Sequence, residues 1–139
     1  MYLTFTEYQS MGGTLDETTF NDLAFEASSL IDWYTFNRLQ KETTFPDAVK
    51  RCMYKLIQYI TTQQQVNGIG VNTSDSTTGG AGITSQSNDG VSVSYNVLSA
   101  RDVVETSKAQ MGEIINQYLS AVVNSLGQKV LYRGVYPNE

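Results

Sequence analysis

Residues 20–34, with the sequence FNDLAFEASSLIDWY, decide the fold class of this chain. Their apolar members recur every three or four positions, at Phe20, Leu23, Ala24, Ala27, Leu30, Ile31 and Tyr34. This spacing places them along one side of an α-helix, which we expect to begin at a capping box over residues 14–17, or at one of the two threonines that follow, and to continue to about Leu39. The stretch therefore predicts a long amphipathic helix and a mainly α fold.

The opposite side of this helix is unusual because it carries three large aromatic residues. Phe25, Trp33 and Phe36 project away from the apolar stripe, among Asp22, Glu26 and Ser29. Large aromatic side chains on a polar face require a cover. That cover is either the rest of the monomer or a neighbouring subunit, and the sequence leaves both explanations open.

Further helices follow from the same reasoning. Thr6 and the three residues after it form a capping box, which predicts a short helix ending at Gly12-Gly13. A second long helix begins after Pro46 and carries an apolar stripe of Val49, Cys52, Met53, Leu56 and Ile60. A third begins at a Ser99 cap, stops at Gly127, and carries Met111, Ile114, Ile115, Tyr118, Leu119, Val122 and Leu126. We expect a small bundle of three long helices.

The segment between the last two long helices contains a loop and a hairpin. Residues 67–82 are rich in Gly, Ser, Thr and Asn, which predicts a long mobile loop. Apolar and polar residues then alternate over residues 83–95, which predicts a β-hairpin. A three-residue turn that includes Gly90 would pair Ser87 with Val91 and Ile83 with Tyr95, so that one face is apolar. The residues expected to contact a neighbour are Ser87, Asn88, Asp89, Gly90 and Tyr95.

The C-terminal residues 128–139 are too apolar for an ordinary frayed terminus. Alternation of side chains along them suits an extended strand that lies against another chain. We therefore divide the sequence into a helical domain of residues 1–127 and a docking tail of residues 128–139. The residues predicted to dock are Leu131, Tyr132, Arg133, Gly134, Val135 and Tyr136.

Composition argues against catalysis. The 139 residues form one domain with a net charge of −5, a single cysteine and no histidine. Without histidine, a Ser-His-Asp triad, a Cys-His pair and a His-bearing zinc site are excluded. The paired carboxylates of Asp22 and Glu26 have no partner nucleophile, and the glycines of residues 67–82 lack the context of a phosphate-binding loop. We expect no enzyme, no metal and no cofactor, a Cys52 thiol buried in a reducing compartment, and neither a secretory signal nor a membrane span.

Charge is distributed unevenly along the chain. Residues 1–37 contain acidic residues and no basic one, whereas Arg38, Lys41, Lys50, Arg51 and Lys55 follow within a short interval. Such polarity either orients a neighbouring molecule or reflects solvated helix faces. A nucleic-acid contact through the basic interval is a rival hypothesis, although the overall acidity and the lack of a recognition helix weaken it.

Several segments occur in an order that is similar to one viral family. They are Thr6-Glu7-Tyr8, then Phe20, Ala27, Ile31-Asp32, Thr35 and Arg38, then the hairpin sequences of residues 83–87 and 90–95, then Tyr118-Leu119, and finally Leu131-Tyr132-Arg133-Gly134-Val135. Over nearly its whole length the chain resembles the head-tail connector, or adaptor, proteins of long-tailed phages and related prophages. The hairpin and the terminal Tyr-Arg-Gly-Val are the most specific parts. Gln86, where many relatives carry an acidic residue, and the extended loop depart from the family pattern.

The resemblance implies a structural virion protein rather than an enzyme. Subunits would form a ring, a dodecamer in the virion, below the portal protein in the neck, after assembly in the host cytoplasm. The tail would dock into the portal, the aromatic residues Phe25, Trp33 and Phe36 would contact neighbouring subunits, and a stopper or tail-completion protein would bind below. Double-stranded DNA would pass through without sequence-specific binding, and no membrane would be involved. Loop and tail would become ordered on docking. The alternatives are a DNA-packaging or other nucleic-acid-binding accessory protein, and a stopper or tail-completion protein.

Overall fold

A computed structural model of the chain describes residues 1–70, 85–88, 91–94 and 100–137, and the side chains of residues 1–65 and 102–137. This part of the chain is mainly helical, as predicted. Its elements are α1 (Phe5–Ser10), α2 (Glu17–Thr35), the 3-10 helix η1 (Arg38–Lys41), α3 (Asp47–Gly70), β1 (Ser85–Asn88), β2 (Val91–Ser94) and α4 (Ala100–Leu119). The expected Ser99 cap and residues 71–82 of the expected loop lie outside the described residues.

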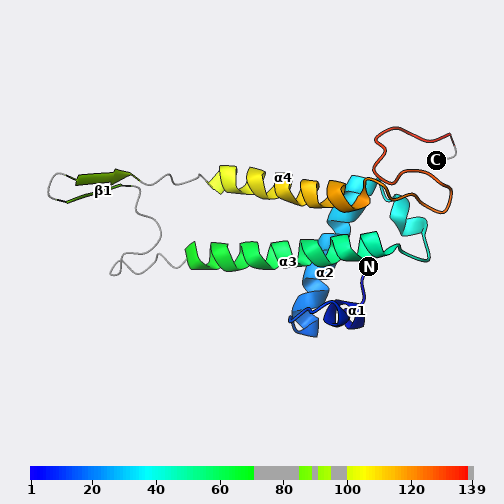
Figure 1. Ribbon diagram of the computed structural model, residues 1–139, viewed down its shortest axis with the longest axis horizontal. Helices are drawn as coiled ribbons and strands as arrows, with labels where there is room; N and C mark the ends of the chain where they lie inside the picture. Colours follow the sequence, from blue (N-terminus) through cyan, green and yellow to red (C-terminus); the bar gives the residue numbers. More distant parts are fainter. Residues whose placement is uncertain (71–84, 89–90, 95–99, 138–139) are drawn as a thin grey trace.

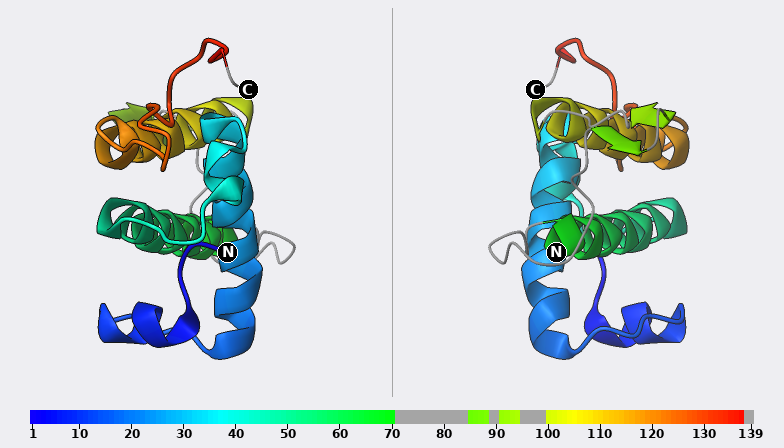
Figure 2. Two further views of the ribbon diagram at one scale, coloured as in Figure 1. Left: turned by 90° about the vertical axis from the view of Figure 1, so that its right-hand side faces the viewer. Right: turned by 90° about the vertical axis from the view of Figure 1, so that its left-hand side faces the viewer.

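The long helices form two layers rather than an aligned bundle. Helices α3 and α4 lie side by side and run in opposite directions (Figure 1). Helix α2 crosses this pair on one face, and the short α1 lies next to α3 on the side away from α4 (Figure 2). One side of α2 therefore faces the α3–α4 pair and its other side faces outward.

The core lies where α2 crosses the pair. Phe20 and Ile31 from α2, Met53 and Leu56 from α3, and Ile115 from α4 are completely buried. The predicted stripe residues of the second long helix, Val49, Cys52, Met53, Leu56 and Ile60, are all buried, and those of the first are buried except for the half-buried Leu30 and Tyr34. Apolar periodicity thus identified the inward faces of α2 and α3 correctly.

The helix ends differ from the expected positions. The N-cap of α1 is Thr4, which forms the capping box with Glu7, and not Thr6. The N-cap of α2 is Asp16, whose carboxylate accepts from the Thr19 N–H at 3.0 Å. Helix α2 ends at Thr35, before Leu39, and α4 ends at Leu119, before Gly127. Helix α3 extends to Gly70, so the expected loop does not begin at residue 67.

The short strands β1 and β2 pair antiparallel beyond the ends of α3 and α4 (Figure 1). The register pairs Asn88 with Val91 and Ser85 with Ser94. The expected register, with Ser87 opposite Val91, is therefore wrong by one residue. A shift of one residue moves every side chain to the other face of a strand. The pairing that would have given one consistently apolar hairpin face is therefore wrong as well.

Candidate docking surfaces

The outward side of helix α2 and the residue that follows the helix carry aromatic side chains that nothing in the described chain covers. Phe25 and Trp33 are 73% and 72% exposed, and Phe36 is 53% exposed. We call these three residues the aromatic face. Asp22 and Glu26 lie on the same outward side of the helix and are also exposed. Of the two explanations that the sequence left open, cover by the rest of the monomer is therefore wrong for the described chain.

The C-terminal end of α2 turns the chain sharply. Phe36 and Asn37 both adopt the left-handed conformation, with φ of 54° and 58°. This conformation costs Phe36 roughly 1–2 kcal/mol, whereas asparagine adopts it more readily. The turn is closed by the Asn37 N–H, which donates to the Asp32 carbonyl at 2.9 Å. It keeps Phe36 at the surface and directs the next residue, Arg38, into the protein, where only 5% of Arg38 is exposed.

Arg38 holds the C-terminal segment through its backbone. One guanidinium nitrogen donates to the carbonyl of Val130 at 3.3 Å and to that of Tyr132, and the other donates to the carbonyl of Gly134 at 2.7 Å. The three acceptors are alternate residues of the C-terminal segment. Charged donors make stronger hydrogen bonds than neutral ones, and the planar fork of arginine fixes their geometry. Arg38 therefore attaches a segment that lies more than ninety positions away in the sequence.

Aromatic rings complete the environment of the Arg38 guanidinium. It lies 5.3 Å from the centre of the Phe36 ring and 5.0 Å from that of Tyr136. Both distances are within the range of cation–π attraction. The guanidinium thereby links the end of the aromatic face to the C-terminal segment.

A compact turn places this segment against the core. The Val130 N–H donates to the Val122 carbonyl at 3.1 Å, and the side-chain oxygen of Asn124 accepts from the Gln128 N–H at 2.8 Å. Gly127 takes a φ of 74° within the turn, a conformation that glycine adopts without strain. Val130 is completely buried, so the core extends into the segment expected to be a separate tail.

The free, extended tail expected from the sequence is therefore wrong for residues 128–137. Within this segment Val135 is 82% exposed, Tyr132 is 50% exposed and Arg133 is also exposed, whereas Leu131, Gly134 and Tyr136 are half-buried. The Tyr132 and Tyr136 rings contact each other at 4.9 Å, and the Tyr136 hydroxyl accepts from the Lys129 N–H at 2.9 Å. The tail is folded onto the subunit and presents only part of its predicted docking residues.

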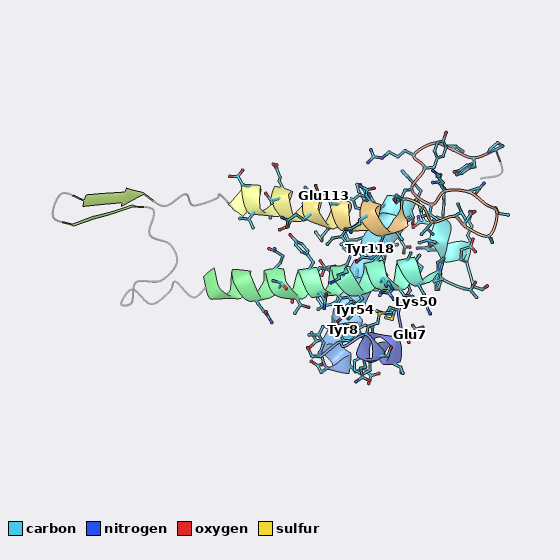
Figure 3. All side chains as sticks on the ribbon, viewed as in Figure 1. Glu7, Tyr8, Lys50, Tyr54, Glu113 and Tyr118 are labelled. Carbon is cyan, nitrogen blue, oxygen red and sulfur yellow. The ribbon has the colours of Figure 1, made fainter. Side chains whose placement is uncertain are left out.

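The corner formed by α1 and α3 is fixed by a half-buried ion pair. Lys50 on α3 and Glu7 on α1 approach to 2.5 Å, and Figure 3 shows both residues at this corner. The Lys50 ammonium, followed by hydrogen bonds from Thr4, lowers the pKa of Glu7 to about 2, and Glu7 in turn raises the pKa of Lys50. Both shifts favour the charged pair.

A groove opens beside this corner, on the side of α3 that faces away from the core. It has a volume of about 350 Å³ and is lined by Ser10, Met11, Arg51, Tyr54, Lys55 and Tyr118. We call it the basic groove. Figure 3 labels its two tyrosines, Tyr54 on α3 and Tyr118 on α4. Arg51 and Lys55 are exposed, and none of the six residues that line the groove is acidic.

The basic interval of the sequence does not form one continuous patch. Arg38 is buried under the C-terminal segment, and Lys50 is paired with Glu7. Lys41, Arg51 and Lys55 remain exposed. The rival hypothesis of a nucleic-acid contact through this interval is therefore weakened, because Arg38 is buried and Lys50 is paired with a carboxylate.

Chemically reactive groups are few in the described part of the chain. The Cys52 thiol is buried, and burial raises its pKa to about 12, which leaves it protonated and unreactive near neutral pH. Among residues 1–65 and 102–137, no group of three acidic or cysteine side chains has the arrangement of a metal site. None of the described helices has the length and apolarity to cross a membrane.

The hairpin positions expected to contact a neighbour lie only partly within the described chain. Ser87 and Asn88 belong to β1, whereas Asp89, Gly90 and Tyr95 lie outside the described residues. The contact role of all five stays a prediction.

Sequence reasoning missed the role of Arg38. Its neighbours Leu39 and Lys41 belong to a short 3-10 turn, and nothing local marks Arg38 as buried. No local signal in the sequence could have found this role, because the carbonyl partners of Arg38 lie more than ninety positions later in the chain. Comparison of the chain with protein-family models, with curated proteins and with solved structures found no match.

Proposed function

We propose that this chain is a subunit of a head-tail connector of a tailed phage or prophage. In this proposal the subunits form a ring below the portal, a dodecamer in the virion neck, and the C-terminal segment contacts the portal protein. A stopper or tail-completion protein binds the other side of the ring, and double-stranded DNA passes through. The role is assembly, without chemistry and without a cofactor.

The observation that carries this proposal is the extent of uncovered aromatic and apolar surface. Phe25 and Trp33 of the aromatic face are more than two-thirds exposed, and Val135 of the tail is 82% exposed. Phe36 lies close to the tail, because its ring and that of Tyr136 both contact the Arg38 guanidinium. Exposed aromatic clusters of this kind are typical of surfaces that partners cover. The surface extends from one helix to the C-terminal segment, which suits a subunit with more than one neighbour.

The attachment of the tail changes how docking would work. The Arg38 hydrogen bonds to the carbonyls of Val130 and Gly134 fix the backbone of the tail in the isolated subunit. A binding segment that is already ordered loses less entropy on association than a disordered one. The portal contact would then be made by the exposed Tyr132, Arg133 and Val135 on a preformed loop.

The acidic balance is compatible with a DNA conduit. Residues 1–37 carry no basic residue and the whole chain has a net charge of −5. A channel lined by negative charge repels the phosphate backbone, so DNA passes without being held. Such repulsion requires that acidic residues face the channel of the ring.

The test is binding to portal rings encoded beside the same chain. Removing the tail would also remove the buried Val130, so a point substitution is cleaner than a truncation. Val135→Asp places a charge at a position that is 82% exposed, and Leu126→Asp, at a position 70% exposed, is the matched control. We expect Val135→Asp to lose co-sedimentation with portal rings while Leu126→Asp keeps it. Equal binding by both variants would remove the tail from the contact, and no binding by the wild type would refute the connector role.

The nucleic-acid alternative has a different signature. Contacts of Arg51 and Lys55 with phosphates would make binding to double-stranded DNA fall steeply as salt concentration rises. On the connector proposal we expect weak DNA binding, and a tight association with a steep salt slope would favour the alternative.

A further inference from the structure

The two most distinctive surfaces of the subunit lie on opposite sides. The aromatic face is on the outward side of α2, which crosses one face of the α3–α4 pair (Figure 2). The basic groove is on α3 half a turn away from its buried residues, between α1, α3 and α4. One subunit therefore cannot bring its own aromatic face to its own groove.

The two surfaces are complementary in charge. Asp22 and Glu26 flank the aromatic face, and this part of the chain has no basic residue before Arg38. Arg51 and Lys55 are the exposed charges of the groove, with Asp47 one turn earlier on α3. Opposite charges on two patches favour their encounter and fix its orientation.

The two surfaces also match in size and in chemistry. The groove, at about 350 Å³, is near the lower end of the roughly 300–1,000 Å³ of small-molecule sites, which suits one or two inserted side chains. Trp33 and Phe25 are the two large aromatic side chains of α2 that project most. Arginine and lysine attract aromatic faces, and the Met11 thioether and the two tyrosine rings supply apolar contact.

We propose that the aromatic face of one copy, with Asp22 and Glu26, seats in the basic groove of a second copy. The inference rests on the proposed function in one respect, namely that the chain assembles with itself. It goes further by naming which surface meets which. Because the two surfaces differ, the contact is heterologous, and repetition of it gives a closed ring or an open filament rather than a twofold dimer.

Charge reversal with rescue tests the pairing. Asp22→Lys/Glu26→Lys and Arg51→Glu/Lys55→Glu each place like charges opposite each other, and we expect each to weaken self-association by about 100-fold in sedimentation velocity over a concentration series. A mixture of these two variants restores opposite charges at both contacts between unlike chains, so we expect mixed assemblies in which the two variants alternate. The matched controls are Glu113→Lys and Lys41→Glu/Lys129→Glu, which alter exposed charges elsewhere.

Zero-length cross-linking identifies the contact directly. A carbodiimide joins a carboxylate to an amine only where the two groups touch, so a mixture of ¹⁴N- and ¹⁵N-labelled chains should yield mixed peptides that connect Lys55 with Asp22 or Glu26. The reaction is run on the free chain and on the chain bound to portal rings. Absence of these mixed peptides in both samples would overturn the inference.

The outcomes separate this inference from the proposed function. Self-association or portal binding that is insensitive to both charge reversals would refute the pairing while leaving the connector role intact. Failure to bind portal rings, together with mixed cross-links, would refute the connector role and keep the pairing. Protection of the groove from cross-linking by inorganic phosphate or DNA, without any mixed peptide, would assign the groove to an anionic ligand and overturn the pairing.

Discussion

The aromatic face of α2 and the C-terminal segment look alike in sequence and differ in structure. Both combine aromatic or apolar residues with charges, and both patterns are typical of surfaces for a partner. The side chains of Phe25 and Trp33 are more than two-thirds exposed, whereas the backbone around Val130 is fixed by Arg38 and the Val130 side chain is buried. The aromatic face is open to solvent, whereas the C-terminal segment is a folded loop of which only some side chains are exposed.

The two surfaces depend on different kinds of sequence information. The direction of Phe25 and Trp33 follows from the helical period relative to the buried Ala24 and Ala27, which is a local property. The position of the C-terminal segment depends on hydrogen bonds from Arg38 to residues more than ninety positions later. Sequence patterns predict the local direction of a helical side chain, but they do not predict hydrogen bonds between residues that are distant in the sequence.

The largest expected effect comes from breaking the attachment of the tail. Arg38→Met keeps most of the apolar stem but leaves the carbonyls of Val130, Tyr132 and Gly134 without their charged donor. We expect the free energy of unfolding to fall by about 2–3 kcal/mol, the contribution typical of hydrogen bonds to a charged group. Urea titration measures this fall, and faster cleavage by trypsin at the exposed Arg133 reports release of the segment.

Lys41→Met is the control for this substitution, because Lys41 lies in the same 3-10 turn and is exposed. We expect it to change neither stability nor cleavage by more than a surface substitution does. If Arg38→Met behaves like Lys41→Met, the tail is not held by Arg38 and the contrast between the two regions disappears.

Particular residues show where sequence reasoning succeeded and where it failed. The stripe of Val49, Cys52, Met53, Leu56 and Ile60 is long and regular, and burial follows it at every position. The ends of α2 and α4 shifted because competing contacts decide them: Asp16 caps α2, and the turn around Asn124 ends the apolar run that Leu126 was expected to continue. The predicted register of β1 and β2 is off by one residue because turn type and loop length fix the register of a hairpin, and alternation of side chains alone does not determine them.

The aromatic face and the basic groove also differ in how far the sequence predicts them. The sequence predicts that the aromatic face points outward from the helix. It does not predict whether the rest of the monomer or another molecule covers this face. The basic groove could not be predicted, because its residues come from three elements that are distant in the sequence: Ser10 and Met11 at the end of α1, Arg51 on α3, and Tyr118 on α4. Only the packing of these helices brings the side chains together.

A smaller effect on stability is expected from the half-buried carboxylate of Glu7 than from the buried guanidinium of Arg38. Glu7 has its pKa lowered to about 2 from 4.5, chiefly by Lys50. The ion pair therefore adds stability that is fully present above about pH 4.5 and is lost as the pH falls toward 2. We expect Glu7→Gln to be less stable than the wild type at pH 6, by less than Arg38→Met, and to match it near pH 2.

Urea titrations of both chains across this range measure the difference. Because the glutamine amide in Glu7→Gln keeps the hydrogen-bonding shape of the capping box without its charge, the comparison isolates the charge. A gap between the two chains that is unchanged at low pH would show that the carboxylate does not titrate with the shifted pKa.

Substitutions in the aromatic face should have the smallest effect on folding. They also test directly whether this face is open, in contrast to the folded C-terminal segment. Phe25→Ser and Trp33→Ser remove side chains that are 73% and 72% exposed, so we expect the free energy of unfolding of the monomer to change by no more than about 0.5 kcal/mol. Protection of the buried Cys52 from a thiol reagent should also stay as in the wild type. Sedimentation of the same variants should nevertheless show weaker self-association, because a surface that contributes nothing to the monomer has its energetic role only in contact with another molecule. If instead the monomer loses stability, the rings are covered within the subunit itself, and the open surface that distinguishes α2 from the tail does not exist.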